Sequence, residues 1–209
     1  MKKKIYLAAI ITQEDLAAYH EHKNIDSATL LLKLYTAFLD VFFRKEANTL
    51  PKHKLYDHTI YLKEDTQVSV STLYSMSCDK ALKLCQYLDE NLSKGFIWVS
   101  HSDAAASVLF MKKPEGDLCF CVNYWGLNVI TVKNWYFLPL ISETLNCLSW
   151  VRIFTKLNII AAFNRLCIWE GDEALITFCT YFSLFKYLIM PFSLCNSSVS
   201  FQNYINDTL

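Results

Sequence analysis

The segment Val151-Arg-Ile-Phe-Thr-Lys-Leu-Asn-Ile-Ile-Ala-Ala-Phe163 decides the fold and is the most informative part of the chain. Residues 153–157 mix β-branched and aromatic side chains with polar ones, which predicts a short strand. The pattern breaks after Asn158, so this side chain is expected at the carboxyl end of a strand, where functional groups are often found. The alternative is that Asn158 only closes a turn through hydrogen bonds to its own backbone.

The composition predicts a packed globular protein of one domain or a domain and a half. The chain has 209 residues, no net charge, 53% hydrophobic residues and 15% aromatic residues, which excludes a disordered chain. A neutral chain has no overall attraction for nucleic acid. Only local basic patches such as Lys112-Lys113 could attract nucleic acid. The residue pattern alone favours a solubilising loop at this place.

The cellular location is expected to be intracellular, in the cytoplasm or the nucleus, without a membrane partner. Apolar runs are interrupted by Lys, Asn or Pro well before the roughly 20 residues that a spanning helix needs. Residues 1–11 have the outline of a signal peptide, but Gln13-Glu14-Asp15 follows where small residues should stand, which favours a strand. The eight cysteines have the spacing of neither a zinc site nor a disulfide framework, which favours reduced thiols.

The periodicity of apolar residues and the turn residues between them predict the secondary structure. The expected elements are a helix over 30–42, a strand over 56–62, a helix capped by Ser77 and ending at Gly95, a strand over 96–99, a hairpin over 108–124, a helix opened by Pro139, a hairpin over 166–178, a strand over 185–189 and a final helix from 197. The helix after Ser77 is expected to bury Ala81, Cys85, Leu88 and Leu92. Helices and hairpins alternate without a regular βαβ rhythm, which predicts an α+β fold.

Short catalytic motifs do not narrow the function. The sequence has four glycines and no glycine-rich phosphate loop, and it contains no G-x-S-x-G, H-E-x-x-H or paired C-x-x-C. The residue pattern alone therefore indicates an intracellular α+β domain and no particular chemistry.

The order of eight segments is more specific than any one of them. They are Leu-Asp-Glu-Asn-Leu-Ser-Lys-Gly-Phe-Ile (88–97), Val-Leu-Phe-Met-Lys-Lys-Pro-Glu-Gly (108–116), Cys-Val-Asn-Tyr-Trp-Gly-Leu-Asn (121–128), Phe-Leu-Pro-Leu-Ile (137–141), Ile-Phe-Thr-Lys-Leu-Asn (153–158), Glu-Gly-Asp-Glu (170–173), Tyr-Leu-Ile-Met-Pro-Phe (187–192) and Phe-Gln-Asn-Tyr-Ile-Asn-Asp (201–207). Together they resemble the reverse transcriptase of gypsy-type LTR retrotransposons, of the fungal kind, from about residue 38 to the last residue. Residues 1–50 then look like a leader that follows the protease of the polyprotein, and 51–209 look like the N-terminal part of the polymerase.

The resemblance implies a partial right-hand polymerase, with fingers and upper palm, that ends before the catalytic palm hairpin. Lys112 and Lys113 fall on the fingertip hairpin, where ammonium groups bind the incoming triphosphate. Phe163 falls on the steric gate below the sugar, and Phe192 lies beside the nucleotide. The implied activity is RNA-templated DNA synthesis by two-metal nucleotidyl transfer, with Mg²⁺, deoxynucleoside triphosphates and an RNA/DNA template–primer.

The departures from the family pattern predict that this chain is inactive. Position 158 matches the place where the family has its first metal-binding aspartate. This chain has Asn158 there, which offers a neutral amide to a cation that prefers carboxylates. Cys119 stands in place of an arginine that would contact the triphosphate, and the family's paired-aspartate hairpin is expected after the final helix, beyond this sequence. Mg²⁺ is therefore expected for the family and not for this chain.

The substitutions also predict a mutationally decayed, pseudogene-like copy. Each of them can arise by one C-to-T or G-to-A transition, as in fungal silencing of repeats: Cys119, Cys179, Trp125 and Trp135 for Arg, Asn123 and Asn158 for Asp, Ser193 for Gly and Ser198 for Pro. Two other readings stay open at this stage. One is a non-catalytic module that still binds template–primer, and the other is a polymerase completed by a partner chain.

Overall fold

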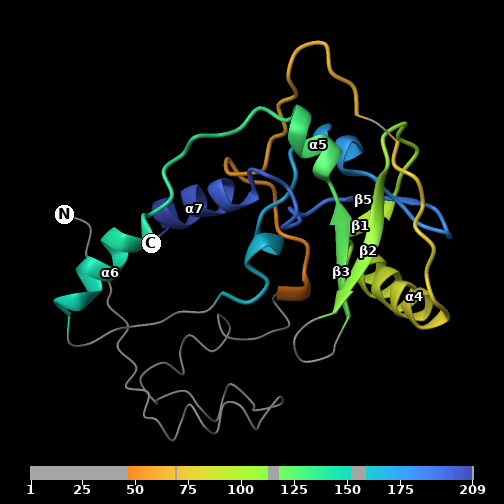
Figure 1. Ribbon diagram of the computed structural model, residues 1–209, viewed down its shortest axis with the longest axis horizontal. Coiled ribbons are helices and arrows are strands. Elements are labelled where there is room, and N and C mark those ends of the chain that lie inside the picture. The colour runs from red at the N-terminus through yellow and green to blue at the C-terminus, as the bar shows by residue number, and fades with distance from the viewer. Residues whose placement is uncertain (1–46, 69, 113–117, 152–158, 209) are drawn as a thin grey trace, which may run out of the picture. The chain divides into compact units, whose positions relative to one another are not determined.

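The computed structural model describes residues 47–68, 70–112, 118–151 and 159–208, which fall into two compact units (Figure 1). The larger unit comprises residues 49–138 and 161–208. The described part of the smaller unit is residues 47–48, 139–151 and 159–160, and it includes helix α6 (Ile141–Ser149). The predicted boundary at residue 50 between leader and polymerase stays a prediction.

A five-stranded mixed sheet forms the centre of the larger unit, and it confirms the α+β fold. Its strands are β1 (Ile97–Val99), β2 (Ala106–Lys112), β3 (Leu118–Asn123), β4 (Phe178–Cys179) and β5 (Leu184–Tyr187). They are ordered β1-β5-β4-β2-β3, and every pair is antiparallel except β2 with β4. The sheet therefore joins two antiparallel pieces through one parallel contact.

The strand over 96–99 and the hairpin over 108–124 are confirmed. Strands β2 and β3 pair from Ser107 opposite Asn123 to Lys112 opposite Leu118. The tip of this hairpin, residues 113–117, lies outside the described residues. Helix α5 (Trp125–Ile130) follows directly and was not predicted, since six residues are too few for a helical period to show.

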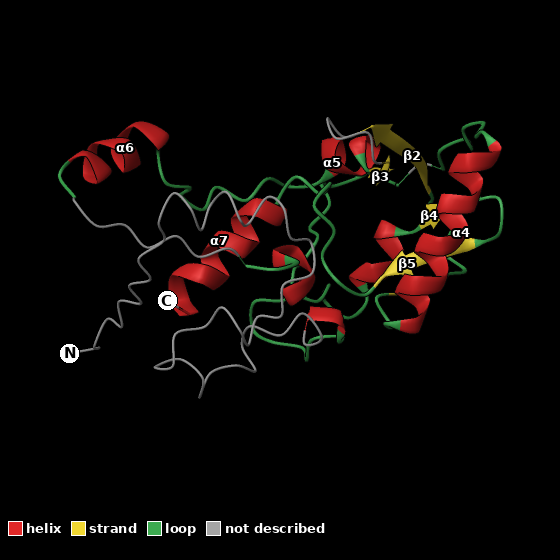
Figure 2. Cartoon of the chain, turned by 90° about the horizontal axis from the view of Figure 1, so that it is seen from below, coloured by secondary structure: helices red, strands yellow, loops and turns green. Residues whose placement is uncertain are grey.

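Helix α4 (Cys78–Ser93) packs against β1 and β3 on one face of the sheet, as Figures 1 and 2 show. Its end agrees with the sequence. Gly95 adopts a left-handed φ of 71° and donates its N–H to the Leu92 carbonyl at 3.0 Å, while Phe96 donates to the Asn91 carbonyl at 2.9 Å. Glycine has no Cβ to oppose this conformation, which closes the helix.

Two details predicted for α4 are confirmed only in part, since Ser77 is the cap residue and Leu88 is buried as expected. Ser77 occupies the cap position, but its hydroxyl makes no capping hydrogen bond. The buried residues are Leu84, Leu88 and Asn91, whereas the predicted Leu92 is exposed. The buried stripe of α4 runs through Leu84, Leu88 and Asn91, at steps of four and three residues. The helix therefore turns a different face to the sheet from the one predicted.

The predicted hairpin over 166–178 is also wrong. Gly171, at a φ of 102°, leads into the 3₁₀ helix η4 (Asp172–Ile176), so that 174–178 cannot pair with 166–169. Residues 166–168 pair instead with the chain after β5. Ile168 donates to the Leu188 carbonyl at 2.9 Å, and Met190 donates to the Leu166 carbonyl at 2.9 Å.

The predicted strand over 56–62 is reduced to two isolated bridges. His58 pairs with Ile168, and Leu62 pairs with Thr131. Between them, the Ile60 N–H donates to a carboxylate oxygen of Asp172 at 2.8 Å instead of to a neighbouring strand. An extended segment that changes partner every few residues cannot form a continuous ladder.

The remaining predicted elements are either confirmed or lie outside the described residues. Helices α6 and α7 (Ser197–Thr208) and strand β5 are confirmed. The helix over 30–42 and the strand over 153–157 fall on residues that the structure does not describe. Within the described residues, no helix combines the length and apolarity needed to cross a membrane. All eight cysteines are free thiols.

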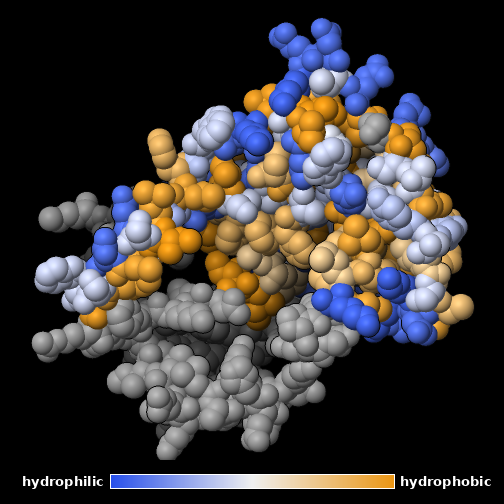
Figure 3. Space-filling view, viewed as in Figure 1, coloured by the Kyte–Doolittle hydropathy of each residue, from blue (hydrophilic) through white to orange (hydrophobic). Residues whose placement is uncertain are grey.

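The apolar face of α6 reaches the surface, as the space-filling view shows at its left (Figure 3). None of the helix residues is buried, and Ile141, Leu145 and Leu148 are all exposed. Helix α6 is therefore amphipathic without a core contact among the described residues.

Leu84 should contribute far more to stability than its neighbour Leu82 on the same helix. The Leu84 side chain is fully buried, whereas Leu82 is 64% exposed. We expect Leu84→Ala to lower the free energy of unfolding by about 2–5 kcal/mol because it leaves a cavity below α4. Urea unfolding of both alanine variants measures the difference, and equal losses would contradict this packing.

Candidate functional site

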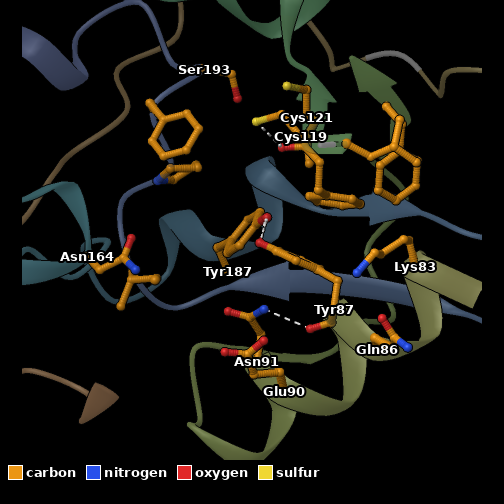
Figure 4. Close-up of a pocket in the computed structure, with 17 residues that line it drawn as sticks. Lys83, Gln86, Tyr87, Glu90, Asn91, Cys119, Cys121, Asn164, Tyr187 and Ser193 are labelled. Atoms are coloured by element: carbon orange, nitrogen blue, oxygen red, sulfur yellow. Dashed lines mark hydrogen bonds between the residues drawn. The ribbon is translucent and has the colours of Figure 1, made fainter. Parts of the chain in front are cut away.

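A pocket of about 360 Å³ opens between α4, β3, β5 and the segment after β5 (Figure 4). Each wall comes from a different part of the chain. Helix α4 supplies Tyr87 and Asn91, β3 supplies Cys119 and Cys121, and residues 191–193 close the pocket on a further side. The sheet order places these distant segments together.

Two tyrosine hydroxyls meet within the pocket. The hydroxyls of Tyr87 and Tyr187 are 2.7 Å apart, and the Tyr87 ring stacks on Phe120 with centroids 4.1 Å apart. Burial is the main cause that raises the pKa of Tyr87 to about 12, and it holds the pKa of Tyr187 well above its ordinary value. Both phenols are therefore neutral near neutral pH, and they donate and accept hydrogen bonds without carrying charge.

The two cysteines of β3 line the same pocket, as expected for residues two apart on a strand. Burial raises the pKa of the Cys121 thiol, and the neighbouring Cys119 raises it further. Since reactivity requires the thiolate, Cys121 is a neutral wall group and not a nucleophile.

Few charges line the pocket. Among its described lining residues, Lys83 is the one cationic side chain and Glu90 the one carboxylate. Glu90 is already paired with Lys94, one helical turn further along α4. The pocket is consequently close to neutral and rich in aromatic rings.

The structure brings together two of the predicted site residues, Phe163 and Phe192. Their ring centroids are 5.9 Å apart at an interplanar angle of 67°. Phe163 lies in the 3₁₀ helix η3 (Ala162–Arg165) and also contacts Phe201 of α7, with centroids 5.5 Å apart. Phe192 is 64% exposed and lines the pocket, so its ring is free to contact a ligand.

Of the other predicted site residues, the structure describes Lys112 alone. Lys112 is exposed at the end of β2 and does not line the pocket. Lys113 and Asn158 lie outside the described residues. Their predicted roles therefore stay predictions.

Sequence reasoning missed Tyr87, Asn91 and Tyr187 as lining residues. Asn91 donates its side-chain N–H to the Tyr87 carbonyl at 2.7 Å, which fixes its orientation along the helix. The spacing of Leu84, Leu88 and Asn91 is a helical stripe and could have indicated this face. The helical spacing of apolar residues alone cannot decide which of two neighbouring stripes of α4 is buried, because apolar residues occur on both.

Comparison with known proteins places this fold among the reverse transcriptases. The chain superposes on a foamy viral protease-reverse transcriptase in complex with RNA/DNA hybrid with a TM-score of 0.69 and 15% identity, covering 99% of this chain and 28% of that one. A second foamy viral protease-reverse transcriptase structure, dRH in complex with double-stranded DNA, gives a TM-score of 0.66 and 13% identity, covering 99% and 37%. The polymerase-type fold expected from the sequence is confirmed.

Sequence comparison finds relatives among transposon polyproteins. The Tf2-3 and Tf2-7 transposon polyproteins of Schizosaccharomyces pombe are each 28% identical to the chain over 199 residues, which is 95% of its length. The chain spans 15% of the length of these relatives. No protein-family model matches. The chain is therefore similar in sequence to retrotransposon polyproteins and in fold to reverse transcriptases, which agrees with the predicted resemblance.

The pocket tyrosines should make the protein sensitive to alkali. Since the pKa of Tyr87 is about 12 in the folded protein and 10.0 when unperturbed, the unfolded chain loses this proton first as the pH rises. The full stability is present below pH 10, and we expect it to fall by roughly 1.4 kcal/mol per pH unit between the two values.

Urea unfolding across this pH window measures the loss, and Tyr87→Phe should make it shallower. Tyr61→Phe is the matched control because the Tyr61 side chain is 68% exposed. An unchanged slope in Tyr87→Phe would show that the Tyr87 phenol ionises as readily in the folded protein as in the unfolded chain.

Proposed function

We propose that this chain is a decayed segment of a retrotransposon reverse transcriptase that keeps the polymerase fold and has lost nucleotidyl transfer. The relationship to the transposon polyproteins and the reverse transcriptase fold support the descent. The observation that carries the loss is chemical. The pocket wall at position 119 is a cysteine in place of the expected arginine, and the sequence has an amide at position 158.

The apolar part of the nucleotide site is retained in this proposal. Phe163 is held between Phe192 and Phe201, which fixes its ring against α7. A ring held in this way can exclude a ribose 2′-hydroxyl by contact, and Phe192 offers an exposed face to the nucleotide. These aromatic contacts depend on packing and need no ion.

The electrostatic part of the site is lost. A triphosphate is bound by cations and by charge-assisted hydrogen bonds, which arginine supplies in a fixed fork. Cys119 presents a thiol to the pocket instead, and Glu90 of α4 adds a carboxylate whose charge opposes that of a phosphate. The one cationic side chain among the described lining residues is Lys83 of α4.

The residues around the pocket do not fit a pair of Mg²⁺ ions. Magnesium is held by carboxylates, water and substrate phosphates. The single carboxylate among the described lining residues, Glu90, is engaged by Lys94. With asparagine at 158 in the sequence, no step of metal-assisted phosphoryl transfer is assigned to this chain.

A gypsy-type element of fungal origin is the proposed source. The transposon relatives come from the fungus Schizosaccharomyces pombe, and the departures at positions 119, 123, 125, 135, 158, 179, 193 and 198 all fit single transitions. The proposed ancestral partners are deoxynucleoside triphosphates and a template–primer. The structural relatives support the second, because they are complexes with RNA/DNA hybrid and double-stranded DNA.

Nucleotide incorporation and nucleotide binding test this proposal together. The purified chain should incorporate no nucleotide on a primed RNA template with Mg²⁺, with or without Asn158→Asp. Cys119→Arg should tighten binding of a deoxynucleoside triphosphate by about 10–100-fold, because a charged hydrogen bond contributes about 1.5–3 kcal/mol. Incorporation by the unaltered chain would overturn the proposal.

Cys147→Arg is the matched control for the binding measurement. It introduces the same charge at an exposed cysteine of α6 that does not line the pocket. Equal tightening in both variants would mean that the added charge acts non-specifically and not at the pocket.

A second candidate function is a non-catalytic module that binds template–primer. The exposed Lys112 on the β2–β3 hairpin favours it, because an ammonium group at that position can contact phosphate. If the module is retained, log K for an RNA–DNA hybrid falls linearly with log salt, and Lys112→Gln lowers the slope by about 1. Lys133→Gln, at another exposed lysine of the same unit, should leave the slope unchanged. A flat salt dependence would exclude the module.

A further inference from the structure

A second cluster of chemically active side chains lies outside the pocket, where residues 51–57 meet residues 167–170. It contains His53, Asp57 and Cys167, and their ligand atoms all lie within 4.8 Å of one another. Asp57 and Cys167 are buried, with 2% of the Asp57 side chain exposed, whereas 51% of the His53 side chain is exposed. A carboxylate and a thiol thus share a buried space that opens towards an accessible imidazole.

The backbone clamps the two segments together. The His58 N–H donates to the Cys167 carbonyl at 2.9 Å, and the Trp169 N–H donates to the His58 carbonyl at 3.0 Å. A turn in which the Asp57 N–H donates to the Lys54 carbonyl at 3.1 Å sets the position of the carboxylate. The backbone segments that carry the three side chains are therefore held in place by hydrogen bonds.

The hydrogen bonds of the cluster set how the three side chains are oriented. Oδ1 of Asp57 accepts the Lys54 N–H at 3.1 Å, while Oδ2 lies 2.5 Å from Nδ1 of His53. Nε2 of His53 lies 3.9 Å from a carboxylate oxygen of Glu170. Metal-bound histidines typically donate the second ring N–H to a carboxylate, and the exposed Glu170 is near enough to take that role after a small side-chain movement.

We propose that His53, Asp57 and Cys167 form a binding site for a zinc-type divalent cation. Thiolate sulfur, imidazole nitrogen and carboxylate oxygen are the three ligand types of protein zinc sites. One divalent cation would neutralise the Asp57 carboxylate together with the thiolate that forms when Cys167 releases its proton. Sulfur and nitrogen ligands select zinc over magnesium, so this site is distinct from the polymerase metals.

Small movements complete the coordination. Ligand atoms about 2.0–2.3 Å from a tetrahedral ion lie roughly 3.3–3.8 Å apart, so the cation would replace the proton shared by His53 and Asp57 and separate the two side chains slightly. The Cys167 thiol, which donates to the Pro51 carbonyl at 3.2 Å, would release its proton and turn its sulfur to the ion. A water molecule would take the fourth position, and a polar cavity of about 570 Å³ that Asp57 also lines could supply it.

The neighbouring His58 is not a ligand. It is buried, and its Nδ1 lies 2.8 Å from the Ser200 hydroxyl of α7, which engages it in a separate hydrogen bond. Its role is to hold α7 against the segment that carries Asp57. This contact remains when the cation binds, so the ion does not alter the fold around it.

Titration of the purified, metal-free chain with Co²⁺ and with Zn²⁺ tests the site. We expect one tight equivalent, a thiolate-to-cobalt charge-transfer absorption, and displacement of Co²⁺ by Zn²⁺ but not by Mg²⁺. Cys167→Ser should abolish the charge-transfer absorption. Loss of a residue that only hydrogen-bonds to a metal ligand typically weakens metal binding roughly 10–100-fold. His53→Gln should weaken it by more than that, because His53 is itself a ligand.

Matched control variants distinguish metal binding at this site from non-specific metal binding by surface residues. His101→Gln and Cys78→Ser change exposed residues of the same two kinds and should leave the affinity and the spectrum unchanged. Because the His53 side chain is half-exposed, His53→Gln keeps the fold even if Cys167→Ser does not, and its melting transition verifies this. Absence of a tight equivalent, or equal affinity in His53→Gln and the unaltered chain, would overturn the proposal.

Discussion

Phe178 is the residue on which the rest of the structure depends. Strand β4 is two residues long, yet it joins the two halves of the sheet, because Phe178 pairs with Ala106 of β2 on one side and with Phe185 of β5 on the other. So short a ladder is held mainly by side-chain burial. The ring is fully buried and contacts those of Phe120, Phe185 and Tyr187, with centroids 5.8, 5.9 and 5.1 Å away.

If the chain is the decayed copy that we propose, this aromatic core is what keeps the fold while the charged groups of the site are lost. The core depends on apolar burial, which the proposed transitions at positions 119, 123 and 125 leave intact, because these positions lie on the rim of β3 and at the start of α5. Triphosphate binding depends on charge, and an arginine that becomes cysteine loses its charge completely. Fold and chemistry therefore decay separately, and a retained fold is no evidence of retained activity.

The two sites of the molecule differ in how they could be predicted. The sequence indicated Phe163 and Phe192 through the order of the segments, and the structure brings their rings into contact. It gave no sign of the cluster of His53, Asp57 and Cys167, because the two segments are more than a hundred positions apart. The burial of Asp57 beside a cysteine became visible only when the backbone bridge between His58 and Ile168 was known.

The sequence by itself determined the local elements whose signals lie within a few residues. Gly95 ended α4 and the alternating residues around Lys112 formed the β2–β3 hairpin, because a left-handed turn and a period of two are local properties. Tertiary structure alone decided which partner each strand takes. Residues 166–168 had two apolar candidates, the chain at 174–178 and the chain at 188–190, and pairing with the second allowed 172–176 to coil into η4. That choice depends on the burial of Phe178 and Ile176 in the shared core, which is a property of the whole fold and not of either segment.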